Sequence, residues 1–259
     1  MAKVIAVVNQ KGGVGKTTAT INLGIGLTEA GKRVLLIDED PQGSLTDCLG
    51  FPEPDEMNTT LANIMLNIIN EIEMSINYGT LFHEEQVEIL PANIELSGIE
   101  VTLANAMCRE YVLKNYVDRL RPQYDYIIID CMPSLGLLTI NALAAADTVI
   151  IPVQAAKPSV RGLQQLIRTI GKIKKQVNPK LEIAGILPNM VDSRTTYARD
   201  IITLLKESYG DRLRIFDAIP RSVRMEETSA EGRSIYKHEP KGKTAEAYRK
   251  LVGEVLSHE

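Results

Sequence analysis

Hydrophobic positions fall into short, unbroken runs rich in β-branched residues, and these runs alternate with longer amphipathic stretches. Apolar runs without polar alternation are typical of strands buried on both faces of a sheet. The runs lie at 4–8, 33–37, 87–90, 126–129, 148–153, 183–187 and 215–219. Helical periodicity occupies 16–30, 97–119, 137–146, 159–176, 195–208 and 244–256. This alternation predicts an α/β fold, with a mostly parallel twisted sheet flanked by helices on both faces.

The length of 259 residues suits one large α/β domain. No internal repeat, low-complexity tract or long linker divides the chain, so we predict a single domain over residues 1–259. The least regular part is 52–86, which opens with Pro52 and Pro54. We expect it to be an insertion in the same domain that contains short helices.

Composition is that of a globular protein without disulfides or a membrane span. Hydrophobic residues make up 44% and charged residues 24%, as in ordinary soluble globular proteins. The three cysteines are too few and too scattered for a disulfide framework or a four-cysteine zinc site, and free thiols fit a reducing cytosol. No apolar run reaches the roughly 18 residues of a membrane span. Trp is absent and aromatics are 5%, which argues against aromatic base-stacking modules. We therefore expect a cytoplasmic protein.

The net charge of −4 is unevenly distributed. Residues 53–100 carry ten Asp or Glu and no Lys or Arg, whereas residues 194–250 carry thirteen Lys or Arg against nine acids. Because phosphates respond to a local patch, the acidic total does not exclude a nucleic-acid surface. The acidic block 53–100 is either a solvated helical face or a site for a basic peptide of a partner.

A glycine-rich segment joins the first predicted strand to the first predicted helix. Such a turn aims backbone N–H groups at one point, where phosphate oxygens bind. In it, we expect Lys16 to supply charge to the β- and γ-phosphates and the Thr17 hydroxyl to be a ligand for Mg²⁺. The common phosphate-loop pattern has Gly where this chain has Gln10, and a second lysine, Lys11, stands at the loop entrance. The nucleotide-binding residues expected here are Lys11, Gly12, Gly13, Val14, Gly15, Lys16, Thr17 and Thr18.

Acidic residues follow two other predicted strands. Asp38 and Asp40 end the run at 33–37, and Asp130 ends the run at 126–129. Ligands of open α/β sheets bind outside the carboxyl ends of the strands, where the glycine-rich segment also lies. A single acid there is often a helix cap, but three acids beside a phosphate loop are the expected partners of a magnesium nucleotide.

Several segments together resemble the ParA/Soj family of partition ATPases. They are KGGVGKTT, LLIDEDPQGSLT, IELSGIEVTLANAMCREYVLK, YDYIIIDCMPSLGLLTINALAAADTVIIPVQ and IPRSVRMEE with KGKTAEAYRKL. The similarity runs almost from end to end. The lysine-doubled loop alone would indicate the wider deviant-Walker class, which includes MinD, the nitrogenase iron protein and arsenite-pump ATPases.

The resemblance implies specific roles at the phosphate site. Lys16 would contact its own nucleotide, and Lys11 would reach the nucleotide of the partner in an ATP-sandwiched dimer. Thr17 would bind Mg²⁺, with Asp38 and Asp130 in the shell around the metal. Asp40 matches the acid that positions or activates the attacking water.

The resemblance also implies a base site and a DNA surface. Asn189 occupies the adenine-facing position, and Pro220 lies in the loop that walls the base. Arg194 and Arg224 match DNA-contacting arginines of the Soj branch, and Arg221 is assigned to the same surface.

The function implied is ATP-dependent DNA partitioning for plasmid or chromosome segregation. An ATP-bound homodimer would bind double-stranded DNA without sequence preference and release it on hydrolysis. A ParB-like centromere-binding protein or an equivalent activator would stimulate a weak ATPase, and the protein would associate with the nucleoid and not with a membrane.

Three alternatives remain open at this point. A MinD-like membrane-positioning ATPase needs a basic amphipathic helix, but the stretch 247–259 is short and ends in an acid. A metal-cluster carrier needs cysteines near the dimer axis, but the chain has no C-x-x-C motif around Cys108 or Cys131. A ParA-like positioner of protein cargo has the same enzyme chemistry and differs in its partner alone.

Overall fold

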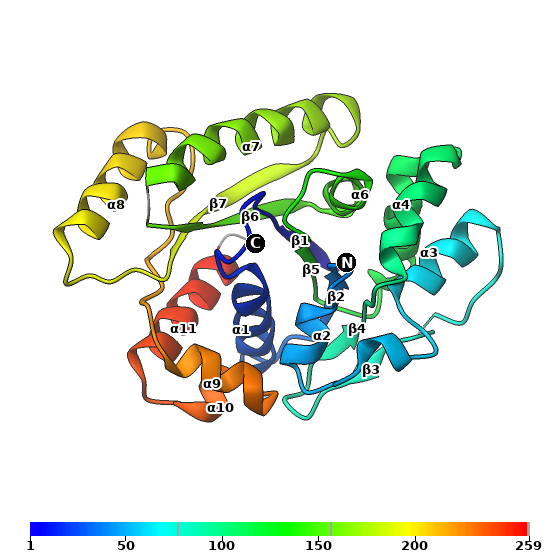
Figure 1. Ribbon diagram of the computed structural model, residues 1–259, viewed down its shortest axis with the longest axis horizontal. Helices are drawn as coiled ribbons and strands as arrows, with labels where there is room; N and C mark the ends of the chain where they lie inside the picture. Colours follow the sequence, from blue (N-terminus) through cyan, green and yellow to red (C-terminus); the bar gives the residue numbers. More distant parts are fainter. Residues whose placement is uncertain (77, 156, 258–259) are drawn as a thin grey trace.

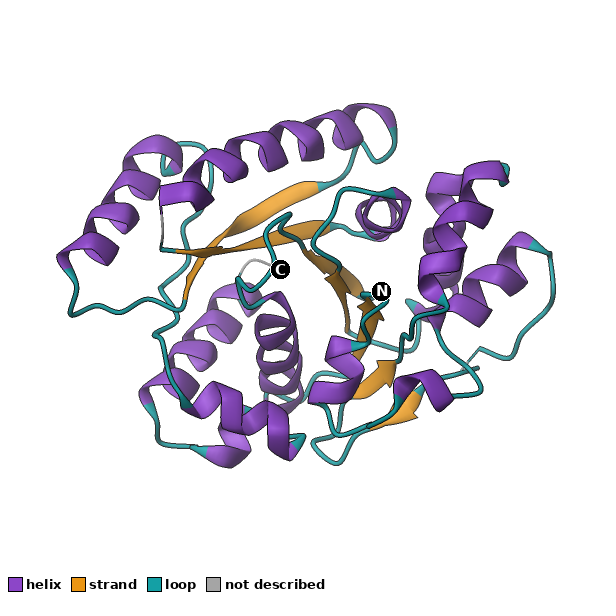
Figure 2. Ribbon diagram, viewed as in Figure 1, coloured by secondary structure: helices purple, strands orange, loops and turns teal. Residues whose placement is uncertain are grey.

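A seven-stranded sheet in the order β3-β4-β2-β5-β1-β6-β7 forms the centre of the computed structural model. The structure describes residues 1–76, 78–155 and 157–257, and for 157–161 the backbone alone. Neighbouring strands are parallel throughout, except that β3 runs antiparallel to β4. Helices lie on both sides of the sheet (Figures 1 and 2). The predicted α/β class is confirmed.

The strands are short and mostly buried. The two strands that carry acids at their ends, β2 and β5, are buried at every position. The bounds are β1 Lys3–Val7, β2 Val34–Glu39, β3 Leu81–Phe82, β4 Glu88–Leu90, β5 Tyr126–Cys131, β6 Thr148–Gln154 and β7 Glu182–Asn189. Burial on both faces explains why the sequence shows continuous apolar runs there and no alternation.

Each face of the sheet has its own hydrophobic core. Residues of α3 to α8 pack on one face, and residues of α1, α2, α10 and α11 pack on the other. The α-helices are α1 Lys16–Glu29, α2 Ser44–Cys48, α3 Leu61–Ile69, α4 Leu96–Asn105, α5 Val112–Leu120, α6 Leu137–Ala145, α7 Lys157–Gln176, α8 Thr196–Tyr209, α9 Arg224–Glu231, α10 Ile235–His238 and α11 Lys243–Leu256. Short 3₁₀ turns, η1 Pro54–Glu56 and η2 Arg109–Tyr111, complete the helical elements described.

The helix predicted over 97–119 is wrong as one element, because α4 ends at Asn105 and α5 begins at Val112. Between them Cys108 adopts a left-handed conformation with φ 50°. The Asn141 side chain of α6 accepts from the amide of Leu113 and donates to the carbonyl of Arg109 at 3.1 and 2.8 Å. A side chain from another helix therefore satisfies the backbone where α5 starts, which periodicity alone does not show.

The strand predicted over 215–219 is also wrong as a strand of the sheet. This segment follows the edge of β7 and makes isolated bridges only, Ile186 with Ile215 and Val191 with Pro220. Pro188 of β7 has no amide hydrogen, so the ladder lacks a donor between these two bridges. The pairing therefore stays interrupted.

The irregular stretch 52–86 contains η1 and α3, as expected, and the short strand β3, which was not expected. The helices α2, α9 and α10 were not predicted either, because they are short and lack a full amphipathic repeat. Among the described residues, no helix is both long and apolar enough to span a bilayer. In the C-terminal stretch 247–259, Leu251 and Val255 are buried in the core, and residues 258 and 259 lie outside the described residues.

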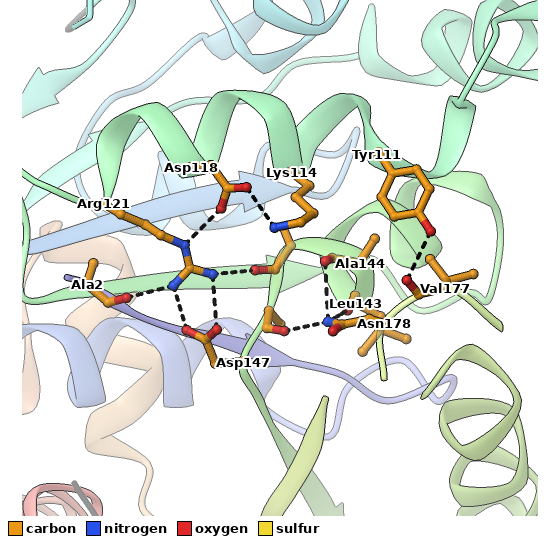
Figure 3. Close-up of polar contacts among 12 residues, drawn as sticks. Ala2, Tyr111, Lys114, Asp118, Arg121, Leu143, Ala144, Asp147, Val177 and Asn178 are labelled. Atoms are coloured by element: carbon orange, nitrogen blue, oxygen red, sulfur yellow. Dashed lines mark hydrogen bonds and ion pairs between the residues drawn. The ribbon is translucent and has the colours of Figure 1, made fainter. Parts of the chain in front are cut away.

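A polar network fastens the amino ends of the central strands (Figure 3). Arg121, just after α5, donates to the carbonyl of Ala2 at 2.8 Å and to the carboxylate of Asp147 at 2.7 and 3.1 Å. Asn178 donates to carbonyls at the end of α6, including that of Ala144 at 3.3 Å. These contacts hold β1 and β6 in register. The carboxyl ends of the same strands, where the glycine-rich loop begins, are therefore fixed relative to each other.

Candidate nucleotide site

The loop between β1 and α1 has the backbone geometry of a phosphate cradle. Gly13 and Gly15 have φ of 68° and 80°, in the left-handed region that favours glycine. A Cβ on Gly15 would overlap the Asn189 amide. The amide of Asn9 anchors the loop by donating to the carbonyl of Pro152 at 2.6 Å, and its oxygen accepts from the amide of Lys11 at 2.9 Å. The first N–H groups of α1, which have no partner within the helix itself, therefore follow directly on this fixed turn.

The two loop lysines lie in different surroundings. Lys16 is 7% exposed, and its charge acts to lower the pKa of Asp130 against the desolvation that raises it. Lys11 is exposed, and its Nζ donates to Oε1 of Gln154 at the end of β6 at 3.1 Å. Lys16 thus suits a fixed contact to a bound phosphate, whereas Lys11 is exposed and held by a single side-chain hydrogen bond.

Two carboxylates lie side by side at the carboxyl ends of β2 and β5. Asp38 and Asp130 are register partners, and both are buried. The Thr17 hydroxyl donates to Asp130 at 2.7 Å, and the Thr20 hydroxyl donates to it at 3.2 Å. Asp38 accepts from the amide and hydroxyl of Thr46 at 2.9 and 2.7 Å. The structure therefore brings together the three predicted metal-site residues.

Burial sets the electrostatics of this acid pair. Desolvation raises the pKa of Asp38 from 3.8 to about 6, against the opposing effect of the Thr46 hydrogen bonds. Desolvation together with the charge of Asp38 raises the pKa of Asp130 from 3.8 to about 7. A divalent cation would relieve this repulsion, and carboxylate and hydroxyl oxygens are the donors that Mg²⁺ prefers. No cluster of three or more His, Cys, Asp or Glu suited to a metal occurs among the described residues. The residues present fit an ion that takes its remaining ligands from phosphate and water.

Asp40 follows β2 and is half-buried at the rim of the site. Its amide donates to Oδ1 of Asp38 at 3.1 Å, and its own Oδ1 accepts from the amide of Gln42 at 3.0 Å. The turn thus fixes the carboxylate next to the acid pair.

Glu39 lies between these two acids in sequence but occupies the other face of the sheet. It is fully buried, and burial raises its pKa well above the ordinary range, against the opposing effect of the Cys131 thiol beside it. Its register partner is Cys131. Glu39 therefore does not belong to the phosphate site.

A pocket of about 380 Å³ opens beside the loop and is lined by Thr18, Asn189, Pro220 and Arg221 among others. Asn189 is 2% exposed and uses both ends of its amide within the chain, donating to the carbonyl of Val14 and accepting from the amide of Met190, each at 2.9 Å. Arg221, assigned from sequence to a DNA surface, is exposed and also lines this pocket.

The other two predicted DNA-contacting arginines are exposed but already paired. Arg194 donates to both oxygens of Asp192 at 2.9 and 2.8 Å, and this contact lowers the pKa of Asp192 to about 2. Arg224 donates to Glu227 at 2.7 Å. Each arginine therefore carries a neighbouring negative charge that offsets its attraction for phosphate.

Sequence reasoning missed three residues that position the site: Thr46, Thr20 and Gln154. Thr20 could have been found, because it lies one helical turn after Thr17 on α1 and so shares its face. Thr46 and Gln154 reach the site from α2 and β6, and their sequence positions gave no signal.

Comparison with known proteins places this site in a family. A family model described as an AAA domain matches residues 2–183. The sporulation initiation inhibitor protein Soj of Bacillus subtilis is 42% identical over 258 residues, covering all of both chains. The chromosome partitioning protein ParA of Caulobacter vibrioides is 38% identical over 260 residues, covering 99% of this chain and 95% of the relative. The chain belongs to the ParA/Soj family. It is thus a P-loop NTPase of the ParA type.

A solved structure resembles this ParA/Soj family member over its whole length. It is a Mycobacterium smegmatis protein named cobyrinic acid a,c-diamide synthase, with a bound ATP analogue and magnesium. The TM-score is 0.86 at 39% identity, and the match covers 100% of this chain and 96% of that one. The predicted fold and family are confirmed.

Proposed function

We propose that this ParA/Soj family member binds ATP and Mg²⁺ at the β1–α1 loop and hydrolyses ATP to ADP and phosphate. One observation carries the proposal. Buried Lys16, the Thr17 hydroxyl and the Asp38–Asp130 pair all lie at the same edge of the sheet. The ATP analogue and magnesium bound to the Mycobacterium smegmatis neighbour support it.

Phosphoryl transfer requires positioning and charge neutralisation more than covalent chemistry. In the proposed reaction the loop amides and Lys16 hold the β- and γ-phosphates. Thr17, Asp38 and Asp130 would hold Mg²⁺, which when bound neutralises the phosphate oxygens. Asp40 orients the attacking water and accepts its proton.

The base of the nucleotide would occupy the pocket beside the loop, against Asn189 and Pro220. The Asn189 amide is already engaged by Val14 and Met190. Asn189 would therefore line the base pocket and hold the loop through Val14, without donating to the base itself.

Dimerisation on ATP would depend on Lys11. In the isolated chain its ammonium is held by Gln154. An exposed hydrogen bond of this kind contributes about 1 kcal/mol, so a triphosphate presented by a second copy can displace it. Closure of two copies would then place each Lys11 on the nucleotide of its partner.

DNA binding would follow from dimerisation. Two weak sets of phosphate contacts act together once they are joined, because the second set binds intramolecularly. Binding should therefore be sequence-independent, sensitive to salt and dependent on ATP. Hydrolysis, stimulated by a ParB-like partner, would separate the two copies and release the DNA.

Asp40→Ala tests the proposal. Removal of the carboxylate that orients water should retain ATP binding and the dimer but stop turnover, which leaves DNA persistently bound. Lys16→Ala is the control variant, because it should lose ATP binding itself. The measurements are phosphate release, sedimentation and DNA mobility shift with MgATP. Normal turnover by Asp40→Ala would refute the role of Asp40.

A further inference from the structure

The outer face of α7 carries a strip of basic residues that is separate from the nucleotide site. Residues 148–181 contain seven Lys or Arg and not one Asp or Glu. The helix α7 lies across the outer strands β6 and β7, at the upper side of Figure 1. A long segment with charges of a single sign on a rigid helix creates a local positive potential that the net charge of the chain conceals.

Helical geometry separates the apolar and basic sides of α7. Leu163, Leu166, Ile170 and Ile173 are buried in the core against the sheet. Arg168, Lys172 and Lys175 are exposed and follow an i, i+4, i+7 spacing. At about 100° per residue, this spacing keeps the three cations within roughly 60° of one another, opposite the buried stripe. We call these three residues the α7 strip.

The α7 strip differs from the predicted DNA-contacting arginines in its pairing. Arg168, Lys172 and Lys175 make no hydrogen bond or ion pair with any described residue. Arg194 and Arg224, by contrast, are each paired with a carboxylate of their own chain. The strip therefore keeps its full charge for an external anion.

We propose that the α7 strip binds the phosphate backbone of duplex DNA. This assignment rests on the proposed function, in which the ATP-bound form holds DNA without reading sequence. The three cations span about 10 Å of helix axis, and duplex DNA carries a negative charge every 1.7 Å or so, so several phosphates face the strip at once.

The same helix argues against a bilayer as the anion. A helix that lies in a membrane interface inserts its apolar side into the lipid. The apolar side of α7 is packed on the sheet and is not available for insertion. A surface of polar glutamines and cations, with Gln164 and Gln165 exposed on the same side, suits a phosphate backbone.

The test compares two triple variants of the full chain. R168Q/K172Q/K175Q removes the charge, and R168K/K172R/K175R keeps it. DNA affinity is measured against salt concentration in saturating MgATP, together with basal ATP hydrolysis. The charge-removing variant should lower the slope of log affinity against log salt by about 0.9 for each phosphate that the strip no longer neutralises. Its affinity should fall at least tenfold, basal hydrolysis should stay unchanged, and the charge-keeping variant should behave as the parent chain.

The failures can be told apart. If the parent chain binds DNA and R168Q/K172Q/K175Q keeps the same slope, the α7 strip is not the DNA surface, while the proposed function stands. If the parent chain does not bind DNA with MgATP, the proposed function fails and this assignment fails with it. If R168Q/K172Q/K175Q keeps the DNA affinity of the parent chain but loses its binding to phosphatidylserine vesicles, the α7 strip is a lipid surface and the assignment is overturned.

Discussion

Replacing Asp130 by asparagine should stabilise the nucleotide-free protein at neutral and alkaline pH. Asp130 is buried beside Asp38, and its pKa rises from 3.8 to about 7 on folding. An acid whose pKa is higher in the folded state destabilises the fold at any pH where the same acid is more ionised in the unfolded chain than in the folded one. The penalty is therefore absent below pH 3.8, grows as the pH rises towards 7, and stays constant above it.

The size of the effect follows from the same values. One pKa unit equals about 1.4 kcal/mol, so the full penalty is about 4 kcal/mol at pH 8 and about 2 kcal/mol at pH 5. Asparagine also weakens the hydrogen bonds from Thr17 and Thr20, which costs about 1–3 kcal/mol. Asp130→Asn should thus gain about 1–3 kcal/mol at pH 8 and close to nothing at pH 5.

Urea unfolding of the nucleotide-free protein, followed by circular dichroism at both pH values, measures this difference. Asp125→Asn is the matched control. The hydrogen bonds from Arg33 lower the pKa of this exposed carboxylate, so its loss should destabilise the protein at pH 8. An Asp130→Asn protein no more stable than its parent at pH 8, or equally improved at both pH values, would refute the account of the acid pair.

Three further changes test the loop, the fold and the contact of Lys11. Gly15→Ala should weaken fluorescent-nucleotide binding at least tenfold, because φ is 80° and the added Cβ meets Asn189; near-parental affinity would show that the cradle tolerates a side chain. Asn141→Ala should lower the free energy of unfolding by about 2–3 kcal/mol and speed hydrogen exchange at the amide of Leu113, whereas unchanged exchange would separate Asn141 from the start of α5. Gln154→Ala should strengthen dimerisation on ATP in sedimentation without changing the affinity for ADP, and the same gain in a Lys11→Ala background would contradict release of Lys11 as the cause.

Much of the fold follows from local pattern. The apolar runs identify six of the seven strands because burial on both faces leaves a continuous signal, and β3 escapes because it has two residues. The proximity of Asp38 and Asp130 was predictable, because parallel strands end at one edge of a sheet.

The remaining features depend on contacts between distant segments. Thr46 holds Asp38 from a helix of five residues that begins after Gly43, too short for any periodicity to appear. Asn141 sets the start of α5 from a neighbouring helix, and Pro188 interrupts the ladder beside β7 through the hydrogen it lacks. Each effect needs the folded chain, because the partner residues lie on different elements that only the fold brings together.

Sedimentation of the protein with a fluorescent duplex tests the central claim most directly. The samples contain no nucleotide, MgADP or Mg²⁺ with a slowly hydrolysed ATP analogue. We predict a dimer that carries the duplex with the analogue alone, and a monomer that leaves it behind in the other two samples. A monomer with the analogue, or equal transport of the duplex in all three samples, would contradict ATP-gated closure on DNA.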